Sequence, residues 1–124
     1  MSKTNYVDGF VLVVPKNKVD EYKKMAKEGE KMWKKFGAID YKECMLDYAK
    51  PEHVVLTFSK LAKAKPNETV WFSYITYKSR QHRDQVNKKV MAEMDKKYSD
   101  QEKNQAMPFD MKRMSYGGFK VMVG

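Results

Sequence analysis

Four stretches of the chain have the pattern of β-strands. Residues 6–14 are dominated by β-branched and aromatic side chains, and Pro15 ends the run. Residues 38–46 place Ile39, Tyr41 and Glu43 on one face of an extended segment, because successive side chains in a strand point to opposite faces. We expect strands over 6–14, 38–46, 70–77 and 114–123, with an additional short strand over 53–58.

Two longer stretches have helical periodicity. After a plausible N-cap at Asn17, apolar residues recur at steps of three and four as far as Phe36, and Gly37 follows in the manner of a helix end. A second amphipathic pattern predicts a helix over 79–98. The segments 59–69 and 99–110 are polar, and we expect loops there.

The expected order of elements is strand, helix, strand, strand, helix, strand. Two such halves give an α+β fold of ferredoxin-like βαββαβ type, an antiparallel sheet with both helices on one face. A chain of 124 residues most simply makes one domain, so we expect residues 1–124 to form a single one.

The strand expected over 70–77 is apolar on both faces. Val70, Phe72 and Tyr74 point one way, whereas Trp71 and Ile75 point the other. Two helices can cover only one face of the sheet, which leaves an apolar patch larger than a monomer usually exposes. We therefore expect a twofold homodimer that packs sheet against sheet.

Composition narrows the class of protein. The chain is 42% hydrophobic and 33% charged, as in a globular domain. Its longest apolar run, residues 10–14, is far shorter than the ~20 residues needed to span a bilayer. No secretory signal pattern is visible, and the single Cys44 cannot form an intrachain disulfide, so we expect a cytoplasmic protein without a membrane partner.

The net charge of +9 raises the possibility of nucleic-acid binding, but its make-up argues against that function. Of the 25 basic residues, 22 are lysine and 3 are arginine, and the lysines are spread along the whole chain. Arginine, rather than lysine, suits bidentate recognition of phosphates and bases. A solvated lysine surface is the simpler interpretation, and weak nucleic-acid binding is the less favoured one.

The start of the second helix carries the densest group of polar side chains. His82 can act as a general acid or base near neutral pH, and Arg83 and Asn87 share a helix face from which they could orient an anionic or carbonyl substrate. The alternative is that His82 and Asp84 only cap the helix, and that Arg83 pairs with an acidic residue across a dimer. No metal-ligand spacing and no phosphate-binding loop is present, so no metal or cofactor is expected.

A cavity between the helices and the sheet is a further expectation. Gly117 and Gly118 interrupt the last strand and would admit a close neighbour such as a ligand. Trp33, Trp71 and Tyr74 would form its wall, although such aromatics also serve as ordinary core. Glu43 would be a buried carboxylate with a raised pKa if its strand face points inward.

Several motifs together resemble the YbaA-like family of uncharacterised bacterial proteins, a domain of unknown function. The motifs are YVDGFV at 6–11, GAIDYKEC at 37–44, SYITYKSRQHRDQVN at 73–87 and MPFDMKRMSYGGF at 107–119. The resemblance implies a dimeric α/β-barrel subunit, and that superfamily includes cofactor-free monooxygenases, haem proteins and ligand-sensing domains. The family motif residues matched here are Asp8, Glu43, Ser79, His82, Arg83, Asp84, Asn87, Asp110 and Arg113.

These observations leave three functions open. The first is a small-molecule site, catalytic or only binding, in the cleft between sheet and helices. The second is a non-enzymatic structural or regulatory dimer, in which Asp84, Asn87, Asp110 and Arg113 form one buried network that ties the second helix to the last strand. The third is nucleic-acid binding through the lysine surface.

Overall fold

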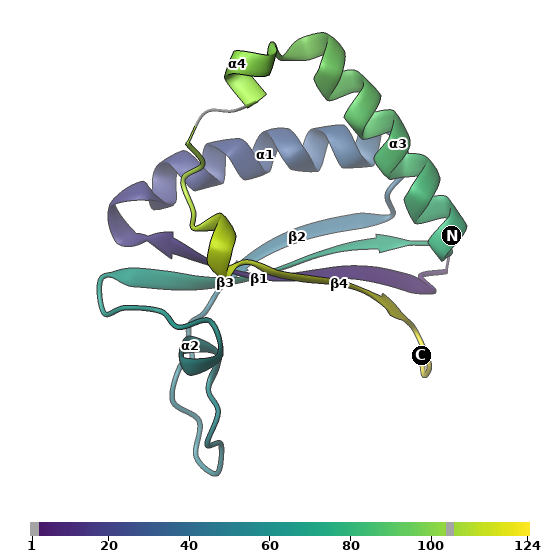
Figure 1. Ribbon diagram of the computed structural model, residues 1–124. Helices are drawn as coiled ribbons and strands as arrows, with labels where there is room; N and C mark the ends of the chain where they lie inside the picture. Colours follow the sequence, from purple (N-terminus) through teal and green to yellow (C-terminus); the bar gives the residue numbers. More distant parts are fainter. Residues whose placement is uncertain (1–2, 104–105) are drawn as a thin grey trace.

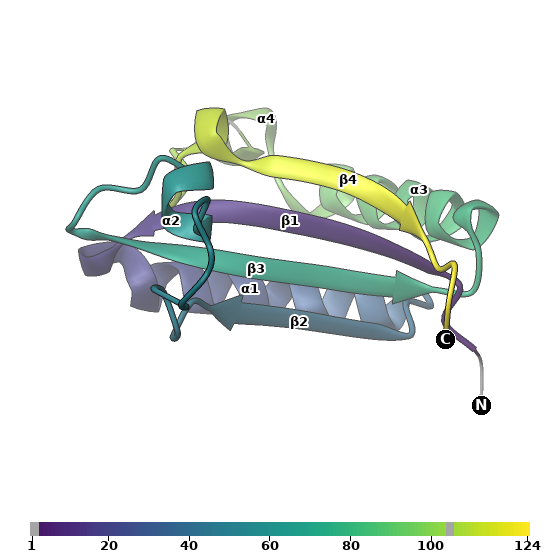
Figure 2. The same ribbon diagram turned by 90° about the horizontal axis from the view of Figure 1, so that it is seen from below.

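The computed structural model describes residues 3–103 and 106–124 and has a mixed α+β architecture (Figure 1). Its sheet is antiparallel and has the strand order β2-β3-β1-β4 (Figure 2). The expected α+β class with an antiparallel sheet is confirmed. The elements are β1 (Tyr6–Pro15), η1 (Lys16–Lys18), α1 (Val19–Lys35), β2 (Asp40–Met45), α2 (Phe58–Leu61), β3 (Glu68–Tyr77), α3 (Arg80–Lys97), α4 (Asp100–Lys103), η2 (Met111–Arg113) and β4 (Ser115–Lys120).

The long helices α1 and α3 both lie over the same face of the sheet (Figure 1). Against α1, Leu12 and Trp71 of the sheet pack on Tyr22. Against α3, the fully buried Tyr77 packs on Val86. These strand residues alternate with others that point away, so the helix-facing side of β1 and β3 is set by the two-residue period of the strands.

The other face of the sheet has no long helix over it, and we call it the open face. Val7 pairs with Thr76 on one side and with Phe119 on the other, and directly paired residues share a face of the sheet. Thr76 lies between the helix-facing Ile75 and Tyr77, so Val7, Thr76 and Phe119 point to the open face. Phe72 and Phe119 are 46% and 61% exposed there. The segment that carries α2 hangs below this face (Figure 1), and it covers only one end, where Ala62 packs on Val13 and Val70.

Local sequence explains where the long helices begin and end. Ser79 caps α3, since its hydroxyl accepts a hydrogen bond from the backbone N–H of His82. Gly37 follows α1 with φ +114°, a conformation that favours glycine. Both boundaries agree with the sequence-based prediction to within two or three residues.

Some expected boundaries differ from the structure. The short strand expected over 53–58 is wrong: turns and bends occupy half of it, Phe58 already belongs to a helix, and His53 has φ +66°, which is incompatible with a strand. Thr57 instead caps the short helix α2 through its side chain. This helix begins just before the segment 59–69, where a loop was expected, and extends into it. The last strand covers Ser115–Lys120 and is shorter than the expected 114–123. It pairs only with β1, and this pairing ends where Lys120 lies opposite Tyr6.

Candidate functional site

A cavity of about 580 Å³ lies between the sheet and the helices α1 and α3. Most of its wall is apolar, and five of the ten methionines contribute to it. The apolar and aromatic wall residues are Phe10, Leu12, Met25, Ala26, Met32, Trp33, Ile75, Met94, Tyr98, Met107, Phe109 and Met114. We call this space the central cavity.

One carboxylate with a ring of hydroxyl groups lies in the wall of the central cavity. Tyr22 donates a hydrogen bond of 2.7 Å to Oε1 of Glu43, and Tyr41 donates one of 2.8 Å to Oε2. Ser73 donates a third, also to Oε1. All four residues belong to the cavity wall. We call them the Glu43 cluster, and it is the most concentrated polar feature of an otherwise apolar space.

The fold brings the Glu43 cluster together from three elements. Glu43 of β2 lies directly opposite Ser73 of β3 in the antiparallel pair. Tyr41 precedes Glu43 by two residues, so both side chains point to the helix-covered face. Tyr22 comes from the buried stripe of α1. Burial and the Glu43 carboxylate together raise the pKa of both tyrosines well above the ordinary value, so both stay protonated and serve as hydrogen-bond donors.

A second hollow of about 450 Å³ runs between α1 and the edge strand β2. Glu43 lines this groove as well as the central cavity. Trp71 lines the groove and is absent from the wall of the central cavity, and its indole N–H donates to Oγ1 of Thr69. The Glu43 carboxylate therefore lies at the boundary between the two hollows. Trp71, which was expected in the wall of the cavity between the helices and the sheet, lines the groove instead.

The expected wall residues Trp33 and Tyr74 are placed differently from each other. Trp33 lines the central cavity, and its indole N–H donates a 3.0 Å hydrogen bond to Oδ1 of Asn87, which joins α1 to α3. Tyr74 belongs to the stretch of β3 in the cavity wall, but its ring lies next to Phe72 on the open face. Asn87 thus holds the two helices together above the cavity.

Arg83 binds acidic and aromatic groups of the protein itself. Its Nη1 donates to Asp8 at 2.8 Å and to the Tyr116 hydroxyl at 2.7 Å, and its Nε donates to Asp84 at 2.7 Å. The guanidinium also lies over the Tyr6 ring. Asp8 is almost fully buried, and burial raises its pKa, an effect that the ion pair with Arg83 opposes. Arg83 therefore fastens the first turn of α3 to β1 and β4.

His82 lies at the start of α3, outside the wall of the central cavity. Its Nδ1 accepts a 3.0 Å hydrogen bond from the backbone N–H of Lys78, and its Nε2 lies close to Gly37 in the turn after α1. Partial burial and the charge of Lys78 lower its pKa, which favours the neutral ring. This arrangement matches the capping alternative for His82 better than a role in proton transfer.

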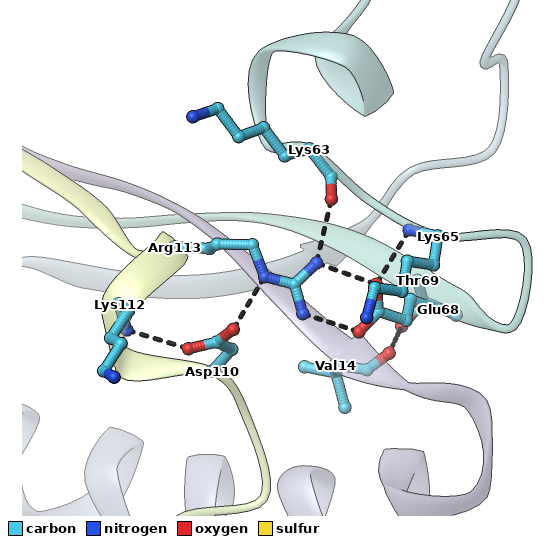
Figure 3. Close-up of polar contacts among 8 residues, drawn as sticks. All are labelled: Val14, Lys63, Lys65, Glu68, Thr69, Asp110, Lys112 and Arg113. Carbon is cyan, nitrogen blue, oxygen red and sulfur yellow. Dashed lines mark hydrogen bonds and ion pairs between the residues drawn. The ribbon is translucent and has the colours of Figure 1, made fainter.

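Arg113 is the centre of a separate polar network (Figure 3). Its guanidinium makes a two-pronged contact with both carboxylate oxygens of Glu68, at 2.8 and 2.7 Å, and also donates to Asp110 and to the backbone carbonyl of Lys63. This network joins η2 to the start of β3. The guanidinium lowers the pKa of Glu68 to about 2 and also lowers the pKa of Asp110.

The expectation of one network containing Asp84, Asn87, Asp110 and Arg113 is therefore wrong. The hydrogen bonds of the described residues place Asp84 with Arg83, Asn87 with Trp33, and Asp110 with Arg113. The physical reason is distance along the sheet: Asp8, which binds Arg83, lies toward one end of the β1–β3 pair, whereas Glu68, which binds Arg113, lies at the other end. Asn87 bonds Trp33 between the two helices. Only Asp110 and Arg113 belong together.

Three members of the Glu43 cluster were not predicted from the sequence as site residues: Tyr22, Tyr41 and Ser73. Their positions were nevertheless encoded, because Tyr22 belongs to the apolar stripe of α1 and Tyr41 shares the strand face of Glu43. The pairing of β2 with β3, which places Ser73 beside Glu43, is a long-range property and could not be read from either strand alone.

The described residues hold neither a cluster of metal ligands nor a membrane-spanning helix. Within 3–103 and 106–124, no three His, Cys, Asp or Glu side chains converge so that they could hold a metal ion. In the same ranges, no helix combines the length and the apolar character needed to cross a membrane.

Comparison with known proteins gives a family and no activity. The family model described as "Protein of unknown function (DUF1428)" matches residues 5–111. The "Uncharacterized protein YbaA" of Escherichia coli K12 is 42% identical over 118 residues, which cover 95% of this chain and 97% of the relative. The proteins of the same description from Escherichia coli O157:H7 and Shigella flexneri have the same identity and coverage.

Proposed function

Since the chain belongs to the DUF1428 family of proteins of unknown function, we propose its function from the central cavity: the protein binds a small molecule between its sheet and its two long helices. The observation that carries this proposal is one carboxylate with its hydroxyl donors in the wall of a hollow that is otherwise mainly apolar. This combination of apolar walls and few polar groups is typical of ligand sites.

The size of the central cavity supports the proposal. A volume of about 580 Å³ falls within the range of roughly 300–1,000 Å³ that is usual for small-molecule pockets. Five methionines in the wall add adaptability, because the unbranched thioether side chain can repack around different shapes.

The proposal assigns different roles to the residues expected from the sequence. Glu43 and Trp33 contact the ligand. Arg83 and Asn87 do not contact the ligand. Arg83 fixes α3 to the sheet and Asn87 fixes α3 to α1, and these two contacts keep the cavity open. His82 holds the turn after α1, and the first expectation, that it transfers a proton to a substrate, has no support from its position.

Native mass spectrometry of gently purified protein tests the proposal. Met94→Trp enlarges a wall residue of the cavity, and Met91→Trp, three residues earlier on the same helix, is a matched control because Met91 is exposed and outside the wall. We expect a small-molecule adduct on the wild type and on Met91→Trp, and its loss from Met94→Trp. No adduct, or an equal adduct on all three proteins, would overturn the proposal.

We further propose that residues 1–124 form one domain with a ferredoxin-like arrangement, and that two copies pack open face to open face as a dimeric α/β barrel. The strand order β2-β3-β1-β4 and the exposed Phe72 and Phe119 support this assembly. Light scattering tests it: a mass near 14.6 kDa at micromolar concentration would contradict the dimer. Phe72→Lys is expected to lower the mass to that of a monomer.

A further inference from the structure

We propose that the ligand of the central cavity is a ring compound with a cationic hydrogen-bond donor, of which an arylalkylamine in its ammonium form is the simplest example, and that Glu43 binds this group. The inference rests on the proposed function and names the chemical class that the same cavity selects. It is carried by the charges in the wall, the hydrogen-bonding capacity of Glu43 and the aromatic rings around it.

The charges in the wall of the central cavity favour a cation. Glu28, Glu43 and Glu102 are the acidic residues of the wall. Glu28 pairs with Lys97, and Glu102 accepts hydrogen bonds from Ser99, so Glu43 is the wall carboxylate that the described residues leave without a basic partner or a helix-capping role. Lys42 is the single basic residue among the described wall residues, and its ammonium group bonds Asp40 on the open face. The partly buried Glu43 carboxylate disfavours an anionic ligand beside it, because like charges repel in a poorly solvated site.

Glu43 has the capacity to bind one more donor. An ionised carboxylate has two oxygens and about four lone-pair sites. Oε1 accepts hydrogen bonds from Tyr22 and Ser73, and Oε2 accepts one from Tyr41. A ligand N–H can therefore bind Oε2 without displacing any of the three hydroxyl groups. Such a bond between two charged groups is stronger than one between neutral groups.

The surroundings of Glu43 suit a cationic group attached to an aromatic ring. Trp33 and Tyr41 both line the cavity, with ring centroids 6.2 Å apart. Aromatic faces attract cations, and Trp does so most strongly. Phe10 and the methionines provide apolar contact for the rest of the molecule. The wall thus offers a match for both the ring and the ammonium group of an arylalkylamine.

Arg83 does not reverse this preference. A carboxylate ligand, as first expected from the sequence, would need a free guanidinium in the cavity. Arg83 instead uses its Nη1 and Nε donors on Asp8, Tyr116 and Asp84, and it is outside the cavity wall. Arg83, the residue expected to bind a carboxylate ligand, therefore stabilises the fold by holding α3 against the sheet.

A matched ligand series tests the inference on the wild-type protein. Naphthalene, 2-naphthylmethylamine and 2-naphthoate share one ring system and differ in the charge of one substituent. Isothermal titration at neutral pH is expected to show the amine binding at least ~10-fold more tightly than the carboxylate, with naphthalene in between. In Glu43→Gln the preference for the amine over the carboxylate is expected to fall to within ~3-fold.

The possible results separate this inference from the proposed function. If naphthalene binds and Met94→Trp abolishes its binding, but the carboxylate binds as tightly as the amine, the cavity binds ligands and the inferred class is wrong. If no member of the series binds, the proposed function fails together with the inference. The wild-type comparison is sufficient for this decision should Glu43→Gln fail to fold.

Discussion

The hydroxyl oxygen of Tyr41 lies 2.7 Å from the position that a Cβ atom on Gly29 would occupy. Gly29 is inside α1, where glycine costs about 1 kcal/mol relative to alanine. The close approach explains why a residue so unfavourable for a helix stands there. It lets Tyr41 reach across the cavity wall and donate its hydrogen bond to Glu43.

Gly29→Ala is therefore expected to destabilise the protein although alanine is the better helix former. The added methyl group displaces the Tyr41 hydroxyl and breaks a hydrogen bond to a carboxylate, which costs about 1.5–3 kcal/mol. Against a gain of about 1 kcal/mol in helix propensity, the net loss of unfolding free energy is about 1 kcal/mol. Urea unfolding measured by circular dichroism gives this value.

The control is the same change in a Tyr41→Phe background. Without the hydroxyl oxygen, the nearest ring atom is 3.4 Å from the added Cβ, an ordinary contact. Gly29→Ala should then stabilise the protein by about 0.5–1 kcal/mol. Equal effects of Gly29→Ala in the two backgrounds would show that the Tyr41 hydroxyl is not the reason for the glycine.

The two acidic partners of Arg83 are expected to differ in importance. Asp8 is 2% exposed, and Asp8→Asn leaves Arg83 with a weakened partner in a buried position, at a cost of about 2–3 kcal/mol. Asp84 is 61% exposed, so Asp84→Asn should cost under about 1 kcal/mol. Thermal and urea unfolding of the two variants compare these costs. A larger effect at Asp84 than at Asp8 would contradict the assignment of Asp8 as the main anchor of α3.

His82 is expected to make stability depend on pH near neutrality. Its pKa is lowered in the folded state, so the unfolded chain binds a proton first as the pH falls. The stabilisation is complete above the unfolded pKa of about 6.5 and declines as the pH falls below it. Melting temperatures between pH 7.5 and 5 should decrease in the wild type.

His82→Asn should flatten that profile, because the amide oxygen can accept the Lys78 N–H and does not titrate. His53→Asn is the matched control, since the His53 side chain is 93% exposed. A profile that His53→Asn flattens, and His82→Asn leaves unchanged, would refute this explanation.

The Arg113–Glu68 contact is expected to govern stability in acid. The folded pKa of Glu68 is about 2, below the ordinary value near 4.3, so its stabilisation is complete above about pH 4.3 and is lost as the pH falls toward 2. Glu68→Gln should remove this part of the acid sensitivity. Urea unfolding at pH 5, 4, 3 and 2 measures it, with the exposed Glu52→Gln as the control.

Arg113→Lys addresses the geometry of the same contact. A lysine ammonium cannot reproduce the two parallel hydrogen bonds to Glu68, so the melting temperature should fall nearly as far as in Arg113→Ala. Full stability in the lysine variant would show that charge alone accounts for the contact.

The elements that depend on local pattern were predicted well. The apolar stripe of α1, the Ser79 cap and the alternation in 70–77 are short-range signals, and the structure has the corresponding helices and strand. The segment 53–58 failed because its apolar residues lie in a turn-rich loop, where hydrophobicity without pairing does not make a strand.

The candidate site was predicted only in part. Of the residues proposed from the sequence for a ligand site, Glu43 and Trp33 line the central cavity. The functional role expected of His82 and Arg83 rested on their being adjacent in sequence to an aromatic strand, whereas their partners, Lys78, Asp8 and Tyr116, are set by how α3 meets the sheet. The Glu43 cluster depends on strand register and helix packing together, which no local pattern contains.

The most direct test of ligand binding in the central cavity uses the methionines. In protein labelled with ¹³C at the methionine methyl groups, naphthalene is expected to shift the signals of the five wall methionines, Met25, Met32, Met94, Met107 and Met114. The signals of Met45, Met91, Met111 and Met122, which are exposed and outside this wall, should stay in place. Shifts confined to these four, or no shifts at all, would contradict the account.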